Sequence, residues 1–215
     1  MIFQIIQKSV NLFAAEFVIQ GTAGEELGRI RLQGSIRTYT ADMDGYFLQH
    51  RFSLQYGMRD RHSIEGKKIQ PYSVSVDGRE CGAVFETIQR ESLFKSYSFH
   101  RLVLNSVEYD RYPIGMGEEG GKHPIYHGNR QVALIEKDAV VYNALHQYRI
   151  YAEDAYAGLC AVLFACYMHV QGAYRAGEKI QKSVVKRVTY TRDKALLDKY
   201  DPGFKERILA LDHVT

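Results

Sequence analysis

The sequence predicts a mainly β protein: a closed antiparallel β-barrel of about 12 strands around a central apolar helix, with a short helical C-terminal appendage. Three observations favour this fold. Strand-like segments separated by short turns continue to residue 151, residues 154–172 form a segment without a polar face, and the character of the chain changes after Gly177. Many short strands with no long helix between them indicate a sandwich or a barrel and not an α/β fold.

The strands are predicted from alternating or aromatic-rich runs bounded by turn residues. Residues 17–20 and 28–32 flank a Gly-containing connection, and Asp44-Gly45 precede a long run over 46–56. Asp77-Gly78 is the strongest hairpin signal, because both residues tolerate a positive φ. The remaining strands are expected at 72–76, 81–88, 98–109, 125–126, 131–137 and 148–151, with a turn at 127–130.

The central helix is predicted at about 154–172, with Asp154 as its cap. Its body is apolar on every side, so it must be buried all round, in protein or in lipid. About 14 apolar residues give roughly 21 Å of helix, short of the ~30 Å hydrocarbon core of a membrane. Burial in protein is therefore favoured, with no transmembrane span, and a closed barrel of strands is the structure that can surround a helix.

Residues 178–215 are expected to form a basic C-terminal extension on a domain of residues 1–177. The extension holds nine Lys/Arg and six Asp/Glu, which leaves nineteen residues of each sign in 1–177. Residues 182–191 are expected as a further strand or an extended arm, and helices are expected from Asp193 to Tyr200 and from Pro202 to Leu211. Leu196, Leu197, Phe204, Ile208 and Leu211 are expected to cover part of the barrel wall.

A barrel followed by an all-apolar helix resembles the tubby-like superfamily, which includes tubby proteins, LURP-one-related proteins and phospholipid scramblases. The residues that carry the resemblance are 125–137 (strand, turn, strand) and 148–170, and it covers about residues 1–172. It implies a helix threaded through the barrel. Some forty residues follow the helix here, whereas the helix of the family lies close to the C-terminus. No Lys/Arg pair matches the phosphoinositide site of tubby proteins, so no binding residues are carried over.

Candidate catalytic and cofactor motifs have simpler explanations. Residues 115–120 fit GxGxxG, but Glu118 and Glu119 would repel a pyrophosphate and a strand follows where a helix should begin, so we expect a hairpin loop. His123 and His127 would lie roughly 13 Å apart on an extended strand, too far to share a metal ion. No cofactor is expected.

The cysteines and one helical histidine also favour structural roles. Cys160 and Cys166 lie on opposite sides of the helix, and a buried thiol without a base is a poor nucleophile. His169 on the same helix is interpreted as a core histidine. Three cysteines without CxxC spacing, and an N-terminus without signal-peptide features, favour reduced thiols in the cytoplasm.

The densest basic cluster, Lys179, Lys182, Lys186 and Arg187, is either a solvated face or a contact for anionic lipid head groups. A net charge of +3 is too small to indicate a nucleic-acid partner. We therefore expect a binding or interaction module rather than an enzyme, whose partner is an anionic membrane surface at the inner face or another protein. The alternative is a small-ligand carrier or an enzyme with a pocket at a barrel mouth near residues 115–124.

Overall fold

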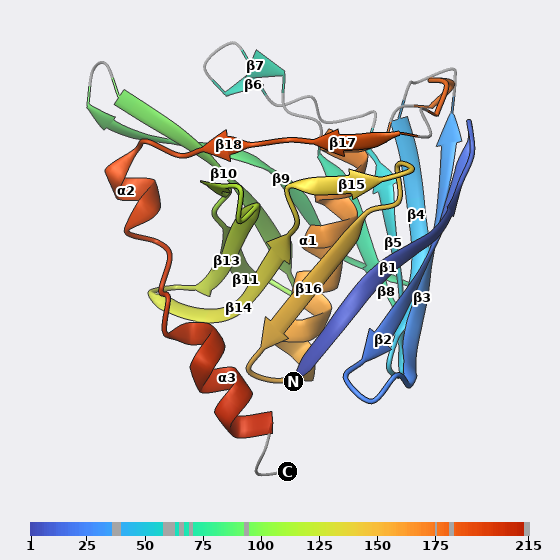
Figure 1. Ribbon diagram of the computed structural model, residues 1–215, viewed down its shortest axis with the longest axis horizontal. Helices are drawn as coiled ribbons and strands as arrows, with labels where there is room; N and C mark the ends of the chain where they lie inside the picture. Colours follow the sequence, from blue (N-terminus) through green and yellow to red (C-terminus); the bar gives the residue numbers. More distant parts are fainter. Residues whose placement is uncertain are drawn as a thin grey trace.

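A computed structural model of the chain shows a closed barrel of twelve antiparallel strands around one helix, so the predicted fold class is confirmed (Figure 1). The structure describes residues 1–35, 40–57, 63–64, 67–68, 71–92, 95–174, 176–180 and 183–212. The strands of the ring, in pairing order, are β1 (Ile2–Val10), β2 (Ala14–Gly21), β3 (Glu26–Ser35), β4 (Thr40–Phe47), β5 (His50–Tyr56), β8 (Tyr72–Val76), β9 (Arg79–Ser92), β10 (Lys95–Leu104), β11 (Val107–Arg111), β13 (Gly121–His127), β14 (Arg130–Lys137) and β16 (Gln147–Ala152). A separate two-stranded sheet holds β6 (Ser63–Ile64) and β7 (Lys67–Lys68).

Two pairings between distant segments close the ring. β1 pairs with β16, with Ile5 opposite Tyr148, and β11 pairs with β13, with Arg111 opposite Ile125. Most other neighbours in the ring are joined by short turns. Closure leaves no free edge on these twelve strands.

Turn chemistry explains which hairpins the sequence could predict. Asp77 and Gly78 both have positive φ (52° and 77°), as a tight hairpin requires, and Gly128 turns the chain between β13 and β14. Residues 46–56 and residues 98–109 are each predicted from the sequence as one long run. The structure corrects this, because each run contains parts of two strands. The first breaks at Leu48 (φ 52°) and the second at Asn105 and Ser106 (φ 51° and 66°).

The helix α1 (Ala155–Gly172) fills the barrel. The Asp154 side chain accepts a hydrogen bond from the Ala157 N–H at 2.8 Å, so the predicted cap is confirmed. Every residue from Ala157 to His169 is buried. Gly158 allows a close approach to the wall, because a Cβ there would lie 3.2 Å from the Phe47 ring. Among the described residues α1 is the one helix long and apolar enough to cross a membrane, and 72% of it is buried inside the protein.

Two short strands of the C-terminal extension cross one end of the barrel. β17 (Val184–Lys186) pairs with β15 (Val140–Tyr142), and β18 (Thr189–Tyr190) pairs with β12 (Ile114–Gly117), as the band across the top of Figure 1 shows. We call residues 183–191 the strap, and this end of the molecule the strap end. The expected strand or arm over 182–191 is therefore found as two strands within its described part.

The C-terminal helices are shorter than predicted. α2 (Lys194–Leu197) is capped by Asp193, and α3 (Phe204–Asp212) begins two residues beyond Pro202. The Asp201 side chain accepts a hydrogen bond from the Gly203 N–H at 2.9 Å, in a turn that precedes the helix.

The extension packs on the outside of the barrel. Phe204 and Ile208 of α3 are buried against Leu134 and Tyr151, and Leu196 is buried in a second cluster on the wall. The expectation for Leu211 is wrong, because this side chain is 60% exposed.

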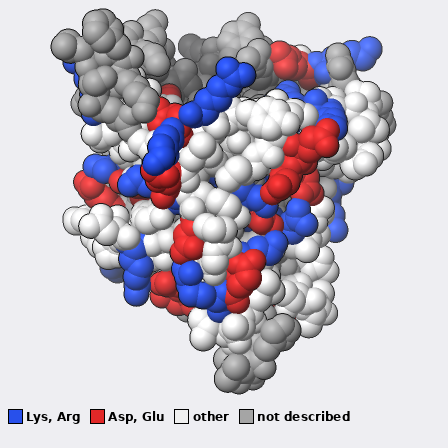
Figure 2. All heavy atoms as spheres, turned by 60° about the vertical axis from the view of Figure 1, so that its left-hand side comes forward, with Lys and Arg blue, Asp and Glu red and all other residues white. Residues whose placement is uncertain are grey.

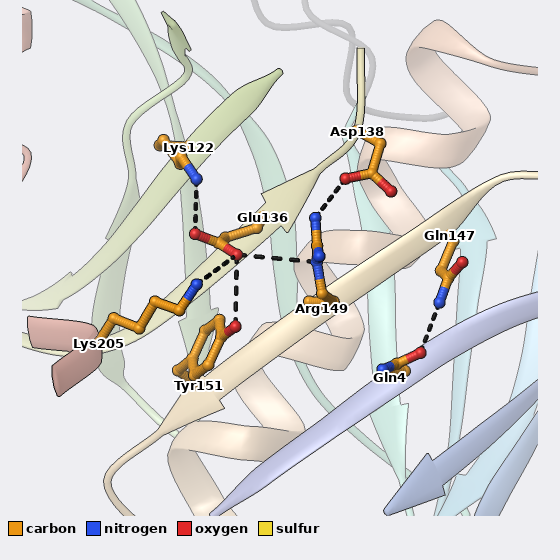
Figure 3. Close-up of polar contacts among 8 residues, drawn as sticks. All are labelled: Gln4, Lys122, Glu136, Asp138, Gln147, Arg149, Tyr151 and Lys205. Carbon is orange, nitrogen blue, oxygen red and sulfur yellow. Dashed lines mark hydrogen bonds and ion pairs between the residues drawn. The ribbon is translucent and has the colours of Figure 1, made fainter. Parts of the chain in front are cut away.

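Polar contacts add to this packing around Glu136 of β14, which is 3% exposed. Its carboxylate lies 2.6 Å from Lys122 Nζ, 3.3 Å from Lys205 Nζ and 3.8 Å from Arg149 Nε (Figure 3). Lys205 belongs to α3, so the buried carboxylate ties the extension to the wall.

Candidate functional site

The strap lies over the end of the barrel at which α1 ends. The Arg187 N–H donates to the Ala139 carbonyl at 2.8 Å, and the Thr191 N–H donates to the Gly115 carbonyl at 3.0 Å. These backbone bonds join the strap to β12 and to the residue that precedes β15. The strap end therefore has a cover built from backbone pairing.

Two pockets lie beneath the strap. The larger, of about 470 Å³, is bordered by Gln7, His169, Lys179 and Val185 among others. The smaller, of about 240 Å³, is bordered by His123 and Lys137 and by Gly115, Gly120 and Gly121. Val141, His146 and Arg187 border both pockets, so the two adjoin. The GxGxxG segment is a hairpin between β12 and β13, and it forms one wall of the smaller pocket.

The inner wall of the barrel becomes polar toward this end. Alternate residues of a strand face the same side, so Lys137 continues the inward row of Ala133 and Ile135 on β14. His123 continues the row of Ile125 on β13 in the same way. His100 on β10 and Arg111 on β11 complete a layer of basic and imidazole groups drawn from four strands.

Arg111 is the most deeply buried charge of this layer, at 3% exposure. Its guanidinium contacts His100 Nδ1 and lies 3.1 Å from His123 Nδ1, while its buried Nε has no partner in the described part of the chain. Burial lowers the pKa of Arg111 to about 10, and burial beside this cation lowers the pKa of His100 to about 2. Burial and the charge of Arg111 also hold the pKa of His123 well below its usual value, so both imidazoles are neutral acceptors for the arginine.

Lys137 is a second cation without an anionic partner. Its ammonium lies 5.5 Å from the centre of the Tyr148 ring, and no carboxylate of the described residues is within ion-pair distance of it. Burial, followed by repulsion from Arg187 and Arg111, lowers the pKa of Lys137 to about 8. The charged form of Lys137 is therefore less favourable in the folded protein than it is in water.

The rings of His146 and His169 pack edge to face, with their centres 5.2 Å apart, at the wall of the larger pocket. The Tyr148 hydroxyl lies 3.0 Å from His169 Nδ1, whereas His169 Nε2 and His146 Nδ1 are buried without a partner among the described groups. Burial lowers the pKa of His146 to about 3 and that of His169 well below its usual value. Although four histidines lie near these pockets, no three His, Cys, Asp or Glu of the described residues are grouped as metal ligands.

The outer rim of the strap end is apolar. Ten large apolar side chains are exposed among the described residues, and seven of them lie at this end. Among the large apolar side chains of the strap, those of Tyr190 (67%) and Val184 (62%) are the most exposed. The seven are Leu12, Phe13, Tyr142, Leu145, Val184, Val188 and Tyr190, and we call them the apolar rim.

The residues of the predicted basic cluster do not all lie at the same place. Lys179 and Arg187 border the larger pocket, and the Arg187 guanidinium donates to the Gly172 carbonyl at 3.3 Å. Lys186 Nζ instead lies 2.5 Å from Glu118 Oε1, in one of the two acidic residues of the GxGxxG segment. Lys182 lies outside the described residues. On the face shown in Figure 2, Lys and Arg lie among Asp and Glu without a broad region of one sign.

The other residues singled out from the sequence hold structural positions. His123 and His127 both lie on β13, and His127 is exposed beside the turn, as expected. Cys160 and Cys166 are free and buried, and burial raises the pKa of both thiols. His169 is a core histidine with one ring nitrogen satisfied, as described above.

A comparison of the chain with protein-family models, with curated proteins and with solved structures gave no match. The resemblance to the tubby-like superfamily therefore stays a prediction.

Four residues of the site were not recognised from the sequence: His100, Arg111, Lys137 and His146. For Lys137 a signal exists, because the alternation Ala133, Ile135, Lys137 places a lysine in an inward row. Arg111 and His146 lie at strand ends, where the inward face cannot be assigned without the register.

Proposed function

We propose that the protein is a non-enzymatic binding module of the tubby-like type whose strap end docks on an anionic membrane surface. The observation that carries this proposal is that, in the described part of the chain, seven of the ten exposed large apolar side chains gather at one end, together with Lys179 and Arg187. Large exposed apolar patches with polar surroundings are typical of interaction sites.

The apolar rim suits a lipid interface. Tyrosine places a ring among acyl chains and a hydroxyl among head groups, and exposed Val, Leu and Phe side chains gain free energy when they leave water. The rim side chains come from β15 and the turn after it, from the strap and from the turn between β1 and β2. Three of them, Tyr142, Val184 and Tyr190, lie on strands, and the others lie in the turns and connections next to strands.

The basic residues supply the preference for anionic lipid. Each Lys or Arg near such a surface contributes ~1 kcal/mol. Lys186 contributes less than this because Glu118 offsets its charge, so Lys179 and Arg187 are the principal described contacts. We expect weak attachment that salt reduces. A peripheral position at the inner membrane face is part of the same proposal.

Sedimentation with lipid vesicles tests the proposal. The intact chain should sediment with vesicles of phosphatidylcholine and phosphatidylserine at low salt, less at high salt, and weakly with phosphatidylcholine alone. Val184→Ser combined with Tyr190→Ser should reduce the bound fraction severalfold. Leu211→Ser, at an equally exposed apolar position on α3, is the matched control and should bind as the parent does. A chain that stays in the supernatant with every vesicle would overturn the proposal.

The second candidate function, a small-ligand carrier with a pocket near residues 115–124, is favoured by one observation. Gly115, Gly120, Gly121 and His123 border the smaller pocket beneath the strap. Such a carrier would take its ligand from solution, which needs no vesicle.

A further inference from the structure

The two adjoining pockets beneath the strap are surrounded by more positive than negative charge. Lys137 and Arg187 border the smaller pocket, Lys179 borders the larger, and Arg111 lies behind His123. Of the acidic residues on the pocket walls, Asp138 is paired with Arg149 and Glu178 is exposed at the mouth. Glu86 lies on the inner side near Arg111.

Cations that border a pocket inside a protein without a paired anion are unusual, because burial of an unpaired charge is unfavourable. Lys137 contacts the face of Tyr148 and no carboxylate of the described chain, and Arg111 contacts two neutral imidazoles. His169 Nε2 and His146 Nδ1 are further buried groups without partners. This set of groups is complementary to an anion.

The larger pocket also has an apolar side, next to the polar Gln7 and Asn11. Val10, Val141, Ala144, Ile180 and Val185 border the larger pocket, next to its junction with the smaller one at Arg187. A ligand that fits both pockets has a charged head and a short apolar body. The mouth at Lys179 and Glu178 is exposed, so a ligand can enter from solution.

We propose that these pockets bind a small amphiphilic organic anion, a carboxylate or a phosphate monoester, with its head against Lys137 and Arg187 and its chain along Val141 and Val185. The inference rests on the carrier function and is independent of membrane docking. It assigns Lys137 as the residue that selects for negative charge.

Calorimetric titration of the intact chain, without vesicles, tests the proposal with octanoate, octyl phosphate and octanol. At least one of the two anions should bind, and octanol should bind at least about tenfold more weakly, the factor that one charge-assisted hydrogen bond supplies. Comparison of octanoate with octyl phosphate identifies the preferred head group. Octanol binding as tightly as both anions would overturn the inference and leave the carrier function standing, whereas no binding of any probe would overturn both.

Lys137→Met removes the charge and keeps most of the length of the side chain. It should weaken anion binding about tenfold or more and leave octanol unchanged. Lys194→Met, at an exposed lysine of α2, is the matched control and should bind as the parent does. Unchanged anion affinity in a folded Lys137→Met chain would overturn the inference.

Proton uptake by the unsubstituted chain gives a readout that needs no variant. An anion beside Lys137 should raise its pKa from about 8, so binding at pH 8 should take up a fraction of a proton. The observed binding enthalpy should then differ between Tris and HEPES buffers, whose ionisation enthalpies differ. Equal enthalpies in the two buffers would count against a head group at Lys137.

Discussion

Lys205 of α3 lies 3.3 Å from the buried carboxylate of Glu136 on β14, so the C-terminal extension is attached to the barrel by a charge in the wall itself. Burial alone raises the pKa of Glu136, but Lys122 and Lys205 outweigh it, and the net pKa is lowered. Lys122 Nζ is the nearer partner, at 2.6 Å. One carboxylate thus links the extension, β13 and β14.

Glu136→Gln should destabilise the protein. The substitution removes the anion between three cations, and loss of one member of a buried ion pair costs about 3 kcal/mol. Urea unfolding followed by circular dichroism measures the change. Glu206→Gln, at an exposed position of α3, is the control and should fall within about 0.5 kcal/mol of the parent. Equal stability of the two variants would show that Glu136 does not hold the extension.

A chain ending at Gly177 should keep its β-sheet signal and lose stability. All twelve strands of the ring and α1 lie before Gly177, whereas the truncation exposes the wall beneath Phe204, Ile208 and Leu196. Burial of each such side chain contributes ~1.5–3 kcal/mol before entropy is subtracted. Circular dichroism decides the outcome, and a lost β-sheet signal would mean that the barrel needs the extension in order to form.

Leu163→Asp should abolish folding. Leu163 is fully buried in the middle of α1, where an unpaired carboxylate costs more than the ~5–15 kcal/mol by which domains are stable. The soluble fraction after expression and the near-ultraviolet dichroism measure the effect. Gln171→Asp, exposed on the last turn of α1, should remain folded. A soluble Leu163→Asp chain with native dichroism would contradict a helix packed inside the barrel.

Lys137→Met should stabilise the free protein at neutral pH. The pKa of Lys137 is lowered to about 8 from an ordinary value of 10.5, so its charged form is less favourable in the folded state than in the unfolded state. At 1.36 kcal/mol per pKa unit, the gain at pH 7 is up to about 3 kcal/mol.

The pH dependence of that gain has a definite sign. The penalty is fully present below the folded pKa of about 8 and disappears as the pH rises toward 10.5, where both states are neutral. Tyr148, His123, His146, His169, Arg111 and Arg187 surround the ammonium, and all of them remain in the variant. Urea unfolding of both chains between pH 7 and about 10 measures the difference, and a difference that grew with pH would contradict a depressed pKa.

The fold could be predicted because its strongest signals are local. An apolar run from Tyr156 to Val170 requires burial all round, and the turn residues at Asp77-Gly78 and Gly128 mark hairpins. The turn at Leu48 carries no Gly or Pro signal, so the strands before and after it merged into one run. β1 was not recognised because Ile2 and Ile6 break its alternation of apolar and polar residues. Ile2 is apolar although it lies on the outer face, because α3 packs there.

The site could not be predicted to the same extent, because strand register assembles it. His100, Arg111, His123 and Lys137 are spread over 38 positions of the chain and meet only when β10, β11, β13 and β14 are paired. His146 is brought to His169 by the return of the chain through β16 and α1. Sequence alternation can show which residues point inward, but not which of them meet.

The pairing of β1 with β16 has a consequence for synthesis of the chain. Phe3 pairs with Ile150, so the outer edge of β1 has no partner until about 150 residues have left the ribosome. At about 5–20 residues per second, the wait is on the order of 10–30 seconds. The helix that fills the interior emerges later still. The nascent chain therefore carries an open strand edge and an unfilled apolar lumen throughout translation, and this is the interval in which a chaperone would bind it and in which neighbouring nascent chains would aggregate.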